Sequence, residues 1–199
     1  MSNRVLVGVL CCLALVATAA SAVAAPIQWA GNGHSYELIN SNQQPISWDD
    51  AEAAAVARGG YLATITSPEE DAWVYQTVVA PNYVPVDRGG PWIGGYWDLP
   101  DYHVWKWVTG EPFAYTDWWP GEPDYYAGDN RVAYSSQTSG IPGRWIDNIN
   151  SGDFPDWHEV GYVIEYNRQN VPEPSTLAIW SLLGGFGIAV GCWRRKRAA

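Results

Sequence analysis

Residues 92–124 read WIGGYWDLPDYHVWKWVTGEPFAYTDWWPGEPD, and this stretch decides the fold. Its first four residues form an apolar run of the kind found in buried strands. From Asp98 to Gly143 the chain is rich in Gly, Pro, Asp, Tyr and Trp, and short strands are expected only at Val104–Val108 and Asn130–Ser135. A loop region of this length in a compact domain is usually functional or disordered, and the aromatic content argues against disorder.

Two helices are expected ahead of this stretch. Ser47 and Asp50 make a capping box before an alanine-rich run, and the pair Gly59-Gly60 ends that helix. Ser67 is expected to cap a second helix, which opens with proline and three acidic residues and runs to about Val79. Both helices are therefore marked at their first residues by side chains that accept backbone hydrogen bonds.

Strands are expected on both sides of the helices and the loop region. Gly33–Ile39 alternates loosely between apolar and polar residues, and Trp145 and Gly161–Tyr166 supply closing strands. Two early helices, followed by small antiparallel sheets around a long loop region, predict an α+β domain.

The N-terminal end has the three-part layout of a secretory signal peptide. Arg4 precedes the apolar run Val5–Ala20, and small residues with an A-x-A cleavage pattern follow. We expect residues 1–24 to be removed, with the mature chain starting near Ala25. The alternative is an uncleaved N-terminal anchor.

The C-terminal end predicts a membrane span. Leu177–Trp193 contains no charged residue, and the basic tail 194–199 follows it, as expected for the cytoplasmic side of a span. A buried core helix is the alternative interpretation. The linker 169–176 contains two prolines on either side of a glutamate, which favours an extended, exposed segment.

Residues 25–168 form the remaining domain, of ordinary single-domain size. They carry six basic and 20 acidic residues, a net charge of −14, which disfavours nucleic acid and suits cations, although it could serve solubility alone. Cys11, Cys12 and Cys192 all lie outside this domain, which excludes disulfides and thiol chemistry within it. Eleven tryptophans supply apolar surface for a core without cross-links.

The order of these pieces resembles the C-type lectin-like domain over essentially the whole of residues 25–168. The match rests on short motifs that occur in the family's order: GYLATI at 60–65, WIGG at 92–95, WKWVTG at 105–110, WWPGEPD at 118–124, WID at 145–147 and YVIE at 162–165. The cysteines that form the family's usual disulfides are absent.

The C-terminal end resembles the PEP-CTERM sorting signal of Gram-negative bacteria. Val171-Pro172-Glu173-Pro174-Ser175, a short span and an arginine-rich end occur in that order. The resemblance implies processing by an exosortase and delivery to the cell envelope or an exopolysaccharide matrix, after tethering by the C-terminal span.

The lectin resemblance implies a calcium ion that helps to hold a sugar. Carried over residue by residue, its metal ligands are Glu122, Asp124, Asp129 and Asp147, which offer the oxygen ligands that calcium prefers. Pro123 is the proline that the family keeps in the cis form.

Two residues depart from the family pattern. Asp124 replaces an asparagine and cannot donate a hydrogen bond to a sugar hydroxyl. Ile146 replaces a calcium-ligating asparagine and has no side-chain oxygen, and Asn148 could compensate only if the strand shifted its register. Tyr125 and Tyr126, beside the loop, are expected to contact a ligand, whereas Trp118 is expected to lie in the core.

An enzyme is not expected. Glu122 and Asp124 would suit glycoside hydrolysis by residue type alone, but the lectin motifs already account for both carboxylates. The chain has no G-x-S-x-G and no H-E-x-x-H, and its three histidines are too scattered to indicate a zinc site.

Two functions therefore remain. The first is a surface or matrix module that binds a glycan or exopolysaccharide with the help of calcium, which the Glu122-Pro123-Asp124 motif favours. The second is a structural or adhesive envelope protein that binds a protein partner and has no calcium-dependent sugar site, which Ile146 favours.

Overall fold

The computed structural model describes residues 25–85, 89–98, 100–136, 140–150, 153–154 and 157–167. The predicted signal peptide (1–24), linker (169–176), membrane span (177–193) and basic tail (194–199) lie outside the described residues. Within the described ranges, no helix is both long enough and apolar enough to cross a membrane.

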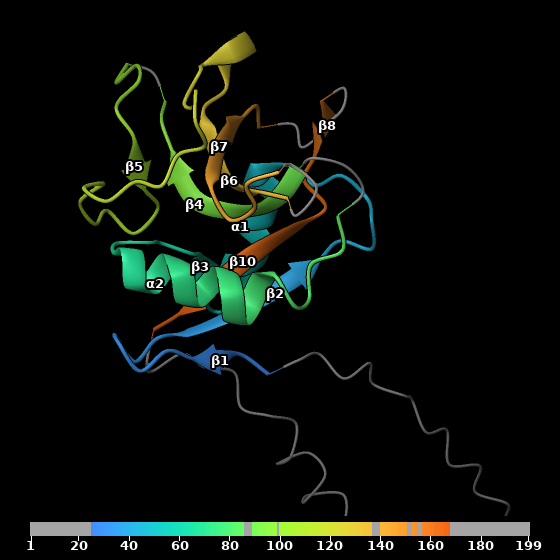
Figure 1. Ribbon diagram of the computed structural model, residues 1–199, viewed down its shortest axis with the longest axis vertical. Helices are drawn as coiled ribbons and strands as arrows, with labels where there is room; N and C mark the ends of the chain where they lie inside the picture. The colour runs from blue at the N-terminus through green and yellow to red at the C-terminus, as the bar shows by residue number, and fades with distance from the viewer. Residues whose placement is uncertain are drawn as a thin grey trace, which may run out of the picture.

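The described residues form the expected α+β domain, with ten strands and two main helical segments (Figure 1). In chain order the elements are β1 (Ile27–Gln28), β2 (Ser35–Asn40), α1 (Trp48–Ala57), β3 (Tyr61–Leu62), α2 (Pro68–Trp73), the π-helical η1 (Val74–Val79), β4 (Gly89–Tyr96), β5 (Lys106–Trp107), the short 3-10 helix η2 (Tyr126–Gly128), β6 (Arg131–Ser135), β7 (Trp145–Asn148), β8 (Asp153–Phe154), β9 (Trp157–His158) and β10 (Gly161–Tyr166).

The sheet corrects one prediction from the sequence. Instead of small antiparallel sheets, eight strands join one mixed sheet in the order β1-β2-β10-β4-β6-β7, with β3 on β10 and β5 on β4; β8 and β9 pair separately. The last strand, β10, lies between β2 and β4 and runs parallel to β4, where Tyr162 pairs with Trp92. Short-range patterns carry no signal for such a pairing between distant segments.

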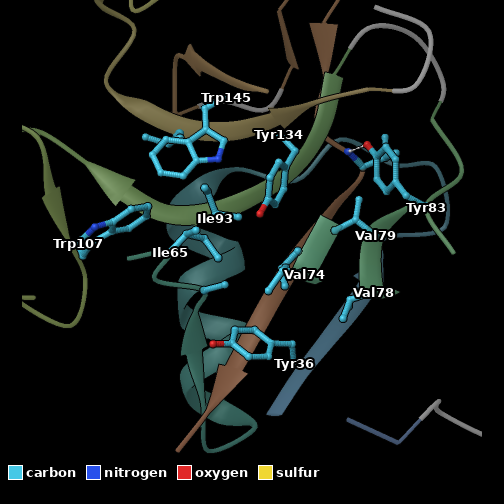
Figure 2. Packing of buried hydrophobic residues seen from close by; sticks show 14 residues of the cluster. Tyr36, Ile65, Val74, Val78, Val79, Tyr83, Ile93, Trp107, Tyr134 and Trp145 are labelled. Atoms are coloured by element: carbon cyan, nitrogen blue, oxygen red, sulfur yellow. Dashed lines mark hydrogen bonds between the residues drawn. The ribbon is translucent and has the colours of Figure 1, made fainter. Parts of the chain in front are cut away.

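Alternating side chains give the sheet two buried faces. On β10, Ile164 packs in a cluster with Ala51 and Ala55 of α1, whereas Val163 packs in a second cluster with Val78 of η1. We call these clusters the α1-side core and the η1-side core. Figure 2 shows the η1-side core, in which aromatic rings from the strands meet the valines of η1.

The helix starts follow their predicted caps. Ser47 Oγ accepts a hydrogen bond from Asp50 N at 3.1 Å, and Ser67 Oγ accepts one from Glu70 N at 3.2 Å. The second helix continues to Val79, as expected, but its last turns are π-helical. Figure 1 shows the helical segment α2–η1 alongside β2, with β5, β6 and β7 at the end of the domain opposite β1.

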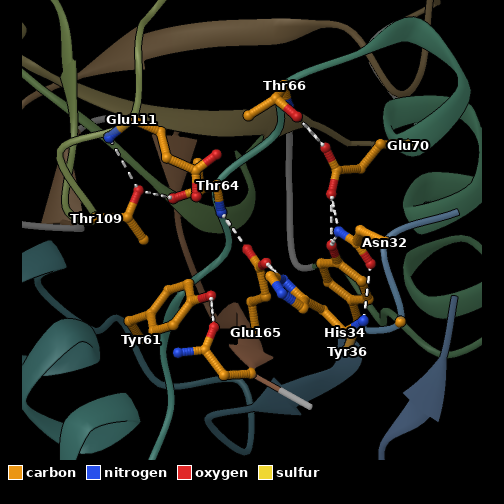
Figure 3. Close-up of polar contacts among 12 residues, drawn as sticks. Asn32, His34, Tyr36, Tyr61, Thr64, Thr66, Glu70, Thr109, Glu111 and Glu165 are labelled. Atoms are coloured by element: carbon orange, nitrogen blue, oxygen red, sulfur yellow. Dashed lines mark hydrogen bonds and ion pairs between the residues drawn. The ribbon is translucent and has the colours of Figure 1, made fainter.

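Buried carboxylates link these elements in place of disulfides (Figure 3). Glu70 accepts hydrogen bonds from the Tyr36 hydroxyl at 2.5 Å and from Thr66 N at 2.7 Å. Glu165 on β10 lies 2.5 Å from His34 Nδ1 through one oxygen and accepts a hydrogen bond from Thr64 N at 2.9 Å through the other. The network joins β2, α2 and β10, whose backbones are far apart in sequence.

Asp71 forms a similar centre inside the η1-side core. Its carboxylate accepts hydrogen bonds from the hydroxyls of Tyr134 at 2.7 Å and Tyr115 at 2.9 Å, and from Trp145 Nε1 at 3.3 Å. Burial raises the pKa of Asp71 to about 6, although these three hydrogen bonds oppose the rise. Burial also raises the pKa of Glu165 to about 7, against the effect of His34.

These shifts predict how stability depends on pH. Each carboxyl holds its proton more tightly in the folded chain than in the unfolded chain, where its pKa is about 4. The stability that the neutral forms contribute is therefore complete below about pH 4. It is lost as the pH rises through the folded-state pKa values of about 6 and about 7.

We expect the unfolding free energy of the full chain, measured in chelator with urea, to fall between about pH 4 and pH 7. Asp71→Asn, which cannot ionise, should show a shallower fall than the wild type. Stability that increased over this pH range would contradict the raised pKa values of these two buried carboxyls.

Candidate functional site

The loop that carries Glu122 and Asp124 is fixed to the start of β7. Trp118 and Trp145 form an isolated parallel bridge, and Trp119 N donates to the Trp145 carbonyl at 2.7 Å. Trp145 is fully buried in the η1-side core, against which Trp118 also packs. The loop is therefore positioned by the core, and Trp118 has the core role expected of it.

Three of the four predicted metal ligands come together. Glu122, Asp124 and Asp147 each place a carboxylate oxygen so that all three oxygens lie within 4.8 Å of one another. The Glu122–Pro123 peptide bond is cis, as the resemblance implied. Because calcium binds oxygen ligands at about 2.3–2.6 Å, oxygens around one ion lie at most about 5 Å apart. The donor set therefore fits a calcium ion.

Asp147 organises the loop as well as the carboxylate group. Its two oxygens accept hydrogen bonds from Asp124 N at 3.1 Å and Tyr125 N at 3.0 Å. Asp124 Oδ1 in turn accepts one from Tyr126 N at 2.8 Å, and Glu122 Oε2 accepts one from Asp124 N at 3.1 Å. The backbone of residues 124–126 is thus wrapped around the carboxylates, each of which keeps further lone pairs for a ligand.

A cavity of about 100 Å³ opens beside this group. Its walls are formed by the predicted ligand residues and their neighbours: Glu122, Asp124, Tyr126, Asp129, Ile146, Asp147 and Asn148. Asp129 lies outside the group of three oxygens but faces the same cavity, with only 8% of its surface exposed. The structure therefore places all four predicted metal ligands around one small space.

The site concentrates negative charge. Burial, a hydrogen bond with Asp147 and the charges of Asp147 and Asp124 raise the pKa of Glu122 to about 8. Burial, followed by the same two charges, raises the pKa of Asp129 to about 7. Carboxylates this close repel one another in a partly dehydrated site, and a bound cation would reduce that repulsion.

Ile146, one of the two departures from the family pattern, lies in β7 together with Asn148. Ile146 is 2% exposed and packs in the α1-side core, because it points to the face of the sheet opposite Trp145. The β6–β7 register is regular from Tyr134 to Arg131, so no shift brings Asn148 into the place of residue 146. Asn148 lines the cavity, but its amide nitrogen donates to Glu159 Oε1 at 2.8 Å.

The two tyrosines expected to contact a ligand differ in their surroundings. Tyr125 has a left-handed backbone (φ 55°), and its ring stacks on His103 with 3.6 Å between centroids and 21° between planes. Tyr126 lines the cavity and is 64% exposed. Of the two tyrosines, Tyr126 is therefore the one that is exposed at the cavity.

Two contacts at the site could not be found by sequence reasoning. His103 supports Tyr125 from the β4–β5 loop, about twenty residues earlier in the chain, and Tyr102 stacks on its other side at 3.7 Å. Glu159 fixes the Asn148 amide from the segment before β10. Neither contact has a spacing signal, because both join segments that approach one another only in the folded chain.

Fold and site together define a lectin-like binding domain. Residues 44–149 match the Lectin C-type domain family, and the chain belongs to that family. The lectins and antifreeze proteins that it resembles are binding proteins, not enzymes, in agreement with the expectation from the sequence.

Particular relatives show a range of ligands. The chain is 32% identical over 126 residues to the type-2 ice-structuring protein of Brachyopsis segaliensis; the match covers 63% of this chain and 66% of that relative, just under two thirds of its length. Among solved structures, the C-type carbohydrate-recognition domain of cow CD23, crystallised in the presence of a GlcNAc2Man3 oligosaccharide, is similar with a TM-score of 0.51 and 26% identity, over 66% of this chain and 86% of that one. A calcium-independent type II antifreeze protein shares the fold, with a TM-score of 0.53 and 23% identity over 69% of this chain and 88% of that one.

Proposed function

We propose that this domain binds carbohydrate with the help of a calcium ion held by Glu122, Asp124 and Asp147. The observation that carries the proposal is the approach of their three carboxylate oxygens to within 4.8 Å. Asp129, in the wall of the same cavity, is the fourth predicted ligand. A bound calcium ion would offer free coordination positions to neighbouring hydroxyl oxygens of a sugar.

The chain's own residues supply the rest of the binding site. Asp147 holds the backbone of residues 124 and 125, and this keeps the carboxylates of Glu122 and Asp124 on one side of the loop. Tyr126 presents an exposed ring at the edge of the cavity, where the apolar C–H face of a sugar can pack. The carbohydrate-recognition domain of CD23 and the family match support this function.

The test is glycan binding to the full chain in calcium and in chelator. The chain should be kept in a polyoxyethylene detergent, which carries no sugar. We expect binding that chelator abolishes, and a loss of roughly tenfold in sugar affinity in Tyr126→Ala but not in Tyr126→Phe, because the phenyl ring keeps the stacking surface. Calcium affinity should remain unchanged in both variants.

Glycan binding that persisted in chelator would contradict the role of calcium. Equal sugar affinities for Tyr126→Ala and the wild type would remove Tyr126 from the binding site. A glycan array with no bound sugar in either buffer would favour the second candidate below.

The second candidate is a structural or adhesive protein that binds a protein partner without calcium. Ile146 is the observation that favours it, since this side chain is packed in the α1-side core and contributes no oxygen to the cavity. The calcium-independent antifreeze protein shows that the fold does not require the ion.

We also propose that the protein is exported, tethered by its C-terminal span and passed by an exosortase to the cell envelope or extracellular matrix. The support is the order of the sequence features: a predicted signal peptide at 1–24, the Val171-Pro172-Glu173-Pro174 motif, an apolar run and a basic end. An exopolysaccharide of that matrix is then the glycan within reach of the domain.

A further inference from the structure

The cavity beside the carboxylate group offers acceptors but few donors. The backbone N–H groups of Asp124 and Tyr125 are bound to Asp147, and that of Tyr126 is bound to Asp124. The Asn148 amide donates to Glu159, away from the cavity. Ionised carboxylates only accept hydrogen bonds, so a matching ligand has to supply the donors.

Asp129 points to such a ligand independently of the other three carboxylates. It is more than nine-tenths buried and faces the cavity, yet within the described part of the chain its carboxylate accepts no hydrogen bond and forms no ion pair. The Asp129 oxygens are not among the buried polar atoms that lack a partner, so they remain accessible from the cavity. A ligand that donates hydrogen bonds into the cavity can therefore reach this carboxylate.

The charge balance narrows the class of ligand. A divalent cation offsets only half of the charge that the four carboxylates carry when all are ionised, so the fully ionised, loaded site would remain negative. Basic residues do not line the cavity, and three of those in the described part are already paired: Lys106 with Asp101, Arg144 with Asp117, and Arg131 with Asp98 at 3.1 Å. The negative charge that remains at the loaded site is therefore available to attract a cationic ligand.

Building on the carbohydrate binding proposed above, we propose that this site selects sugars that carry a free primary amine. An ammonium group donates three hydrogen bonds and carries a positive charge, whereas its N-acetylated counterpart is neutral and donates one. Glucosamine-type units match the acceptor-rich cavity, and sugars that carry carboxylates are repelled. Asp129 and Asp124 are the residues that set this preference.

The test compares two β-1,4-linked oligomers of the same length, one of glucosamine and one of N-acetylglucosamine. Affinity for the full chain is measured by calorimetry near pH 7, in calcium, in polyoxyethylene detergent and at physiological salt. We expect the glucosamine oligomer to bind at least about tenfold more tightly. In Asp129→Asn and in Asp124→Asn this preference should shrink severalfold, because each variant removes one charge and adds an amide donor.

Glu69→Gln is the matched control for overall charge. Glu69 is exposed on the first turn of α2, outside the cavity, and its replacement also removes one negative charge. The preference should survive in Glu69→Gln. Asp124→Asn changes an exposed residue, so it keeps the test valid if Asp129→Asn fails to fold.

Equal affinities for the two oligomers would overturn the proposed selection of amine-bearing sugars. A loss of preference in Glu69→Gln would overturn it as well, because it would show that the glucosamine oligomer is attracted by the overall charge of the protein. The same measurements distinguish a failure of the proposed function from a failure of the amine selection. If calcium produces no binding heat but the glucosamine oligomer still binds through Asp124, the amine selection stands and the calcium mechanism does not. If calcium binds and both oligomers bind equally, the calcium mechanism stands and the amine selection does not.

Discussion

Asp71→Ala should lower the free energy of unfolding by about 3 kcal/mol or more. The substitution leaves the hydroxyls of Tyr115 and Tyr134 and the indole N–H of Trp145 without their common acceptor. Each buried donor left unsatisfied costs about 1–3 kcal/mol, and the missing carboxyl also leaves a small cavity. Removing the carboxylate also removes the cost of burying its charge, but this gain offsets only part of the loss.

Asp71→Asn is the matched control, measured beside Asp71→Ala by urea unfolding near pH 7. The asparagine oxygen can still accept from Tyr134 and Trp145, while its amide can donate to the Tyr115 hydroxyl. We expect a loss below about half of that in Asp71→Ala. Equal losses in both variants would show that the negative charge, rather than the hydrogen bonds, is what the η1-side core requires.

Asp147→Ala should weaken calcium binding by at least about 100-fold. Asp147 has two roles, since it is one of the three clustered carboxylates and also the acceptor for the backbone of Asp124 and Tyr125. Its removal therefore takes away one ligand and releases the loop that positions the others. The measurement is the rise in unfolding temperature of the full chain on addition of calcium, which should vanish in this variant.

The control for this second prediction is again Glu69→Gln, which should keep the full calcium-induced rise. A calcium-induced rise of wild-type size in Asp147→Ala would contradict the assigned site. In that case the clustered carboxylates would be a solvated acidic loop of a lectin-like domain, and the protein-binding candidate would become the better account.

Local signals in the sequence predicted the helices well. Ser47 and Ser67 cap α1 and α2, as predicted. A capping hydroxyl and an acidic first turn act over only a few residues, so a short stretch of sequence is enough to predict them. The π-helical end of the second helix was not predicted. Val78 and Val79 of this end pack in the η1-side core, and no local pattern in the sequence marks the change from α-helix to π-helix.

The sheet was predicted in its parts but not in its assembly. Trp92–Gly95 and Gly161–Tyr166 were recognised as strands, whereas their parallel arrangement was not expected. The expected strand at Val104–Val108 is reduced to the two residues of β5. Pairings between segments about seventy residues apart depend on the tertiary fold, and periodicity within one segment carries no record of them.

The candidate site was foreseen mainly through the family resemblance. The residues Glu122, Asp124 and Asp147 meet as that resemblance implied, and Asp129 reaches the same cavity without joining their group. The hydrogen bond from the Asn148 amide to Glu159 could not be predicted, because it forms where the end of β7 meets the segment before β10 in the folded chain. Ile146 was recognised as a departure, and its place in the α1-side core gives the physical reason why a hydrophobic residue suits that position.

A calorimetric calcium titration of the full chain, with Asp124→Ala alongside, tests the central claim most directly. The clustered carboxylates predict one calcium ion per chain in the wild type and a binding heat that is lost in Asp124→Ala, which removes one of the three clustered oxygens. No heat in the wild type, or a heat that the substitution leaves unchanged, would contradict a calcium site at Glu122, Asp124 and Asp147.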